Sequence, residues 1–177
     1  IKQSGSSITI GESGDTITLP STATLTNFPT NTPLVQAGFS SASQSISSGA
    51  DTEIVYTTIT KETPTGKFST STGRFTPGVT GFYYVSVLAR INGGNNSSEF
   101  GNLQIRLNGV ASTNGTQQGA TYRRYQDTGD HNSFEVSCIL ELTSVTDYIS
   151  AFIYQNQGSS KTLEANHTNF SAYRLIT

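Results

Sequence analysis

The sequence has no methionine, no tryptophan and a single cysteine, and only 12% of its 177 residues are charged. A lone cysteine cannot form a disulfide within one chain, so packing or association has to supply the stability. The net charge of −2 predicts no basic surface for nucleic acid. No apolar run approaches the roughly 18 residues of a membrane-spanning helix, so membrane insertion is not expected. Because methionine is missing, Ile1 is expected to begin a processed chain or the ordered part of a longer one.

Residue patterns for catalysis are also lacking. The chain has two histidines, and neither lies in a GxSxG or HExxH context. No nucleophile is paired with a base, so no catalytic residue is assigned and the chain is not expected to be an enzyme. Asp127 and Asp130, next to His131, leave a Ca²⁺ site open as an alternative, because carboxylates two or three residues apart can share a cation. No EF-hand spacing is present, so no metal ligand or cofactor is assigned.

Cys138 lies in an alternating segment, in phase with the apolar residues Val136 and Leu140. This phase favours its interpretation as a small buried hydrophobe. A nucleophile or an intermolecular disulfide is the alternative, but no histidine that could activate the thiol lies nearby in the sequence.

The residues that are abundant, namely Thr, Ser, Asn and Gly, favour an all-β protein with many short strands and polar turns. The segment 82–89 is apolar on both faces of an expected strand, and 148–154 repeats this pattern. One face of each strand can pack in a sandwich, and the other needs a further partner, for which we expect two more copies of the chain. The trimer interface is accordingly predicted to contain Phe82, Tyr84, Leu88, Tyr148, Phe152 and Tyr154.

The spacing of aromatic and glycine residues in the middle of the chain resembles the signature of the complement C1q-type globular domain, a jelly roll shared with tumour necrosis factor (TNF). The residues that carry this resemblance are Phe68, Phe75, Gly81, Tyr83, Val85 and Val87. Val85 and Val87 stand where the family often has aromatics. The segments 39–49 and 71–77 resemble the bacterial and viral branch of the family. The resemblance covers about residues 34–177 and implies a jelly-roll β-sandwich.

Within this head, turn residues and alternation predict the positions of the strands. Leu103, Ile105 and Leu107 are expected to point inward and to end at an Asn108-Gly109 turn. Residues 92–98 have the composition of a loop. Strands are expected over 34–39, 54–60, 82–88, 103–107, 134–142, 148–154 and 169–176.

Residues 1–33 differ from the rest, with few charges and three short β-like bursts at 7–10, 16–19 and 24–26. These bursts are too small to form a core alone, so we expect them to wrap with other copies. The segment 10–29 resembles Gly- and Thr-rich repeats of tailed-phage fibre proteins, which implies a shaft or attachment segment. A flexible linker is the alternative. Residues 27–33, with two prolines, are expected to join this segment to the head at 34–177.

Residues 115–132 form the longest stretch without alternation, and aromatic and arginine side chains are concentrated there. Such loops often contain the binding residues of a protein, although a strand and loop with merely solvated charges is the alternative. The candidate ligand-binding residues are Tyr122, Arg123, Arg124, Tyr125, Asp127 and His131.

Two functions remain open from the sequence. The first is a virion structural protein of a tailed phage, on the virion surface: a homotrimeric fibre or capsid-decorating appendage that contacts other virion proteins through residues 1–33. Its head would adhere to a host surface glycan or protein, or reinforce the particle. The second is a secreted, extracellular C1q-like recognition module. The state of residues 1–33 distinguishes the two hypotheses.

Overall fold

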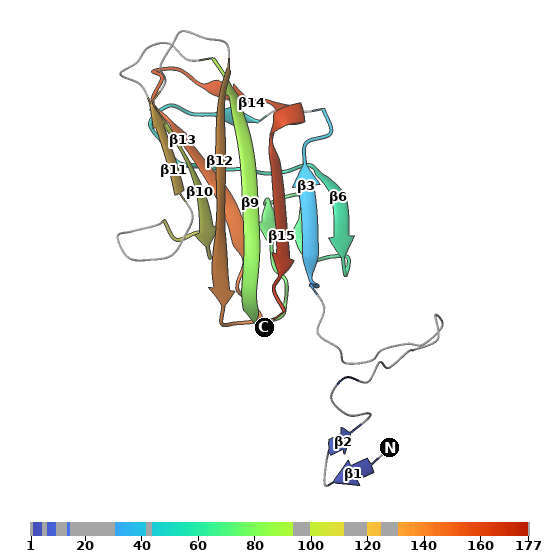
Figure 1. The fold of residues 1–177 in the computed structure, drawn as a ribbon. Coiled ribbons are helices and arrows are strands. Elements are labelled where there is room, and N and C mark those ends of the chain that lie inside the picture. Colours follow the sequence, from blue (N-terminus) through green and yellow to red (C-terminus); the bar gives the residue numbers. More distant parts are fainter. Residues whose placement is uncertain are drawn as a thin grey trace.

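In a computed structural model, the chain forms a sandwich of two antiparallel sheets and a separate short hairpin near its N-terminus (Figure 1). The structure describes residues 2–4, 7–9, 14, 31–41, 44–93, 100–111, 120–124 and 131–176. Among these residues the only helical element has three residues, and none is long enough to cross a membrane. The elements are β1 (Lys2–Ser4), β2 (Ser7–Thr9), β3 (Leu34–Gly38), β4 (Ser45–Ile46), β5 (Thr52–Glu53), β6 (Thr58–Thr63), β7 (Phe68–Ser69), β8 (Arg74–Phe75), β9 (Gly81–Asn92), β10 (Phe100–Leu107), β11 (Ala120–Arg124), β12 (His131–Leu142), β13 (Ile149–Gln155), β14 (Lys161–Leu163), the 3-10 helix η1 (Ala165–His167) and β15 (Asn169–Arg174).

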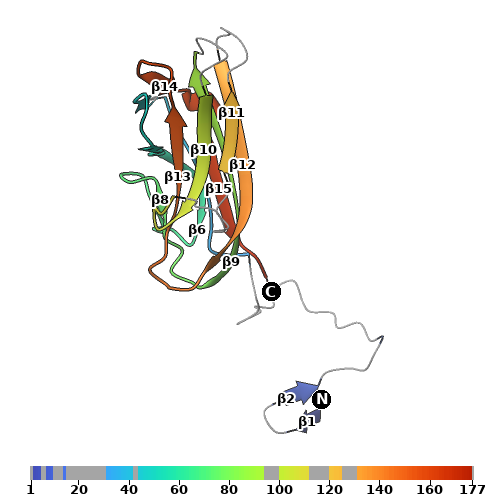
Figure 2. The same ribbon diagram turned by 90° about the vertical axis from the view of Figure 1, so that its left-hand side faces the viewer.

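Two sheets face each other across the core (Figure 2). The first, which we call the β9 sheet, has the strand order β4-β14-β9-β15-β3-β6, and β12 pairs with the other edge of β9. The second, the β13 sheet, has the order β11-β10-β13-β8-β7, and β5 also pairs with β13. Most strands that pair in the sandwich are therefore distant in sequence, apart from β7 with β8 and β10 with β11.

The core lies between the inward faces of the two sheets. Tyr83, Val85 and Val87 of β9 are completely buried, as are Ile149 and Ile153 of β13. Burying each large apolar side chain contributes about 1.5–3 kcal/mol to the free energy of folding. The inward face predicted for the segment 82–89 is thus confirmed, and Leu103 and Ile105 of β10 are buried as predicted.

The turn between β7 and β8 needs glycine at one position. Gly73 has a φ of +74°, and a Cβ atom there would lie 2.0 Å from the carbonyl oxygen of Ile54. No other residue fits without moving that backbone. The Ser-Thr-Gly-Arg-Phe sequence therefore makes a tight turn that brings Phe68 opposite Phe75 in the core.

One predicted strand is partly wrong. Residues 54–57 are not in a strand, although Ile54 and Tyr56 are completely buried. Here the chain passes from β5, in the β13 sheet, to β6, in the β9 sheet. Two backbone amides of this crossing segment still have hydrogen-bond acceptors. The amide of Ile54 donates to the carbonyl of Ala151, and the amide of Val55 donates to the side chain of Gln44. Apolar alternation alone does not distinguish such a crossing from a paired strand.

The two ends of the sandwich differ in what they carry (Figure 1). We call the end near the C-terminus, where β9 begins and β12 ends, the base, and the opposite end, with β14 and η1, the apex. Leu34 enters the sandwich at the base. In the segment before it, the burst predicted at 7–10 corresponds to β2, which pairs with β1. The bursts at 16–19 and 24–26 lie outside the described residues, so the shaft and the division at residue 33 stay predictions.

Candidate functional site

An apolar row crosses four strands on the outer face of the β9 sheet. The pairing registers align Ile139 of β12 with Tyr84 of β9, Tyr84 with Tyr173 of β15, and Tyr173 with Leu34 of β3. Ile139 is 53% exposed and Tyr173 is 37% exposed, and the rings of Tyr84 and Tyr173 lie 5.4 Å apart. Phe82, two residues before Tyr84 on β9 and so closer to the base, is 39% exposed. We call these five residues the apolar row.

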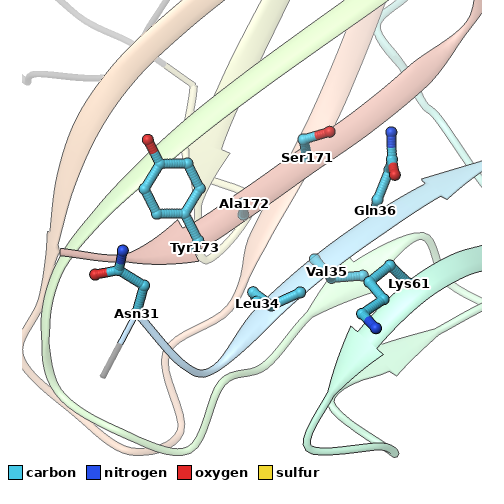
Figure 3. Close-up of a pocket in the computed structure, with 8 residues that line it drawn as sticks. All are labelled: Asn31, Leu34, Val35, Gln36, Lys61, Ser171, Ala172 and Tyr173. Carbon is cyan, nitrogen blue, oxygen red and sulfur yellow. The ribbon is translucent and has the colours of Figure 1, made fainter. Parts of the chain in front are cut away.

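A shallow groove continues the apolar row toward β6 (Figure 3). It has a volume of about 440 Å³, and Figure 3 shows Leu34 on β3 between Tyr173 on β15 and Lys61 on β6. The next row toward the apex is polar, because Ser86 pairs with Ser137 on one side and with Ser171 on the other. The exposed apolar surface is thus confined to the half of this face nearer the base. A contiguous patch of this kind indicates an interaction surface.

The outer face of the β13 sheet is different, because the chain's own side chains cover it. The guanidinium of Arg106 lies 4.0 Å from the centre of the Phe152 ring, and that of Arg74 lies 4.4 Å from the Tyr148 ring. Tyr154 stacks on Phe100, with ring centres 5.3 Å apart. These contacts leave Tyr148, Phe152 and Tyr154 partly buried within one subunit.

Acidic side chains hold both arginines in place. Arg106 is only 5% exposed and pairs with Asp51, and it also donates to the side chain of Gln104. Arg74 donates to both carboxylate oxygens of Glu53, at 2.9 and 3.0 Å. The hydrogen bond to Glu53 raises the pKa of Arg74. The arginines are thus part of the folded subunit and keep their rings covered.

The six residues predicted for a trimer interface therefore lie on opposite faces of the sandwich. Phe82 and Tyr84 belong to the apolar row, while Leu88 lies apart from it, between Glu135 and Asn169. Tyr148, Phe152 and Tyr154 are partly buried by neighbours within the same chain. Their part in a trimer interface stays a prediction. Leu34, Ile139 and Tyr173 were not predicted. Only the register brings Ile139 and Tyr173 beside Tyr84, and Leu34 beside Tyr173.

Of the predicted ligand-binding residues, His131 reaches a cluster of charged groups at the apex. Its Nδ1 lies 2.5 Å from one carboxylate oxygen of Glu164, and the Nδ1 of His167 lies 3.5 Å from the other. Arg90 Nε lies 3.0 Å from that second oxygen, in an ion pair. Both histidines of the chain therefore meet at one carboxylate. His131 and His167 are the two histidines of the chain, and beyond this rarity the sequence gives no sign that they lie close together.

Of the other predicted ligand-binding residues, three lie on a described strand. Tyr122, Arg123 and Arg124 lie on β11, where Tyr122 pairs with Asn102 and Arg124 with Phe100. Tyr125 and Asp127 lie outside the described residues, so their role stays a prediction.

The Ca²⁺ hypothesis stays open, whereas the position of Cys138 is known. No group of three His, Cys, Asp or Glu side chains that could hold a metal lies within the described residues, and the Asp127 and Asp130 of the Ca²⁺ hypothesis fall outside that part of the chain. Cys138 is partly buried and packs against the core, in agreement with its interpretation as a small hydrophobe.

Comparison with known proteins identifies the fold. No family model and no curated protein matches the sequence. Among solved structures, Eiger TNF from S. frugiperda is 16% identical with a TM-score of 0.52, covering 81% of this chain and 92% of that one. The globular domain of zebrafish complement 1qA is 15% identical with a TM-score of 0.53, covering 81% and 98%. Murine APRIL is 13% identical with a TM-score of 0.54, covering 80% and 98%.

This chain has the C1q/TNF jelly-roll fold. The predicted all-β jelly-roll sandwich is confirmed. At these identities the similarity concerns the fold alone.

Proposed function

We propose that the chain is a virion structural protein of a tailed phage, a fibre or capsid-decorating appendage whose jelly-roll head is a homotrimer. The observation that carries the trimer is the apolar row, which leaves a tyrosine, an isoleucine and a phenylalanine exposed on one face. In a three-fold assembly each copy packs this face against a different surface of the next copy, so three copies close a ring. Closure removes the apolar row from water without producing a filament.

The positions of the two ends suit such a head. Leu34 enters the sandwich at the base, so the segment that precedes it is joined to the head at that end, and the cluster around Glu164 lies at the apex (Figure 1). Attachment through residues 1–33 would direct the apex away from the particle. The resemblance of the segment 10–29 to phage fibre proteins supports a virion partner for this segment.

Binding by three equivalent apices would be multivalent. Once one subunit of a trimer binds a host surface, the next binds from an effective concentration set by the short distance between subunits. Weak single contacts to a surface glycan or protein would then give strong adhesion. Reinforcement of the particle without a ligand is the simpler version of the same proposal.

A secreted recognition module is the second candidate. It is supported by the similarity of the fold to the zebrafish complement 1qA globular domain and to Eiger TNF. In that case residues 1–33 would be a linker, with no binding partner on a particle.

Light scattering on the full chain tests the trimer directly. We expect a mass three times the 18.9 kDa of one chain at micromolar concentration. A stable monomer would overturn the proposal. A density map of the intact particle then separates the two candidates: contacts between residues 1–33 and capsid, portal or tail protein support the virion role, and a free trimer without them supports the secreted module.

A further inference from the structure

A polar pocket of about 390 Å³ lies at the apex, beside the cluster of histidines. It is formed where the end of β9, the strand β14, the helix η1 and the segment after β3 meet. The partly buried Ala165 forms the apolar part of its wall, and Leu163, which also lines it, is completely buried in the core. Its polar side chains are those of Ser41, Asn92, Thr162, Glu164, Asn166 and His167.

The acidic group of this pocket is fixed and its charge is balanced. Glu164 contacts Arg90, His131 and His167, and its backbone amide donates to the carbonyl of Arg90 at 2.8 Å. A carboxylate held in this way loses little rotamer freedom when a ligand binds. Because Arg90 compensates its charge, the pocket presents no strong net field that would select a charged ligand.

The other polar groups have hydrogen-bonding capacity to spare. Within the described part of the chain, no side-chain hydrogen bond joins Asn92 or Asn166 to another residue, and both are exposed. The side chain of His167 is 51% exposed. Each carboxamide offers two donors and an acceptor, and Thr162 and Ser41 add hydroxyls that do both.

We propose that this apical pocket binds a neutral saccharide. A sugar ring carries several hydroxyls that donate and accept, which suits carboxamide, hydroxyl and carboxylate groups, and its C–H surface suits Ala165. The inference rests on the proposed function for its biological purpose, adhesion to a host glycan. The pocket itself is built from one subunit, so a single copy suffices for binding.

The two histidines allow a direct test, because the chain contains no others. Imidazole NMR signals of the full chain would be followed while D-galactose, D-glucose, D-mannose or N-acetyl-D-glucosamine is added, up to about 100 mM, well above the roughly millimolar Kd of a weak small ligand. We expect at least one sugar to shift the His167 signals in a saturable way. No saturable shift with any of the four would overturn the proposal.

Two matched variants check that the shift comes from the pocket. Asn166→Ala removes an exposed pocket side chain and should weaken binding about three- to tenfold, the loss of one hydrogen bond. Asn132→Ala changes another apical asparagine that does not line the pocket and should leave the Kd unchanged. Equal affinity in both variants would overturn the proposal.

The mass of the same sample separates this inference from the proposed function. A trimer whose histidine signals do not respond to sugar would reject the pocket and leave the trimer intact. A monomer that binds sugar would reject the trimer and leave the pocket intact.

Discussion

The two outer faces of the sandwich have the same apolar sequence pattern but differ in how far their apolar side chains are covered. Both β9 and β13 have apolar side chains on both sides. On the β13 sheet the rings of Phe152 and Tyr148 lie under arginines of the same chain, whereas on the β9 sheet Ile139 and Tyr173 remain exposed. A strand that is apolar on both faces therefore does not by itself imply a second copy of the chain.

The length of the neighbouring side chains explains the difference. Beside β13, the strands β10 and β8 supply Arg106 and Arg74, whose long stems and planar heads cover rings. Beside β9, the register places Ile139 and Tyr173 next to Tyr84, and neither side chain has a long stem with a planar charged head that could lie over the row. What covers an outward apolar residue is decided by its cross-strand neighbours.

The largest expected effect comes from placing a charge in the apolar row. Ile139→Asp should convert the trimer to a monomer, because an unpaired carboxylate in a closed interface costs several kcal/mol. The fold should survive, since Ile139 is exposed in the single subunit. Light scattering measures the mass and circular dichroism the fold.

A matched control for this variant is Val110→Asp, at an equally exposed aliphatic residue in the turn after β10. It should remain a trimer. If Ile139→Asp also stays trimeric, the apolar row is not the interface.

An intermediate effect is expected on the covered face. Arg106→Ala should lower the free energy of unfolding by about 2–3 kcal/mol, because it removes both the cover of Phe152 and the partner of Asp51. The mass of the assembly should not change. Urea unfolding gives the stability, and Arg106→Lys should recover part of the loss through its stem. A change in mass would mean that this face also takes part in association.

The smallest effect concerns the base of the covered face, where Asp147 ties two turns together. Its carboxylate accepts hydrogen bonds from the side chain of Asn108 and from the amides of Ser144 and Thr143. The hydrogen bond from Asn108, followed by that from Ser144, lowers the pKa of Asp147 below its usual value. The folded state therefore gains stability from this group above the unfolded pKa of about 3.9 and loses it as the pH falls through the lower, folded pKa.

Replacing this carboxylate isolates its contribution. Asp147→Asn should reduce stability at pH 7 by about 1–2 kcal/mol and should flatten the loss of stability in acid. Urea unfolding at a series of pH values below about 5 measures both. Parallel acid profiles for the variant and the parent chain would contradict this role of Asp147.

Local chemistry made much of the fold predictable. Alternation over two residues identified the inward faces of β9 and β10, because successive side chains of a strand point to opposite sides. The turn at Gly73 could be recognised because a glycine within a polar run between two phenylalanines is a turn signal. The crossing at 54–57 could not, because burial without pairing looks the same as a strand in the sequence.

The candidate sites were harder to predict from the sequence than the fold. Tyr84 was identified from its own strand, but its neighbours Ile139, Tyr173 and Leu34 come from three other segments of the chain. Likewise, His131 was selected from its loop, while Glu164 and Arg90 are distant in sequence.

The amino-acid sequence alone determined that this protein is a β-sandwich with a jelly-roll head, because strand period, turn residues and aromatic spacing are local properties. Only the tertiary structure decided which apolar face is covered by the chain's own side chains, and that the two histidines share the carboxylate of Glu164. Strand order and register create these contacts between residues far apart in the chain, and a local sequence pattern does not specify which residue of another strand will lie beside a given one.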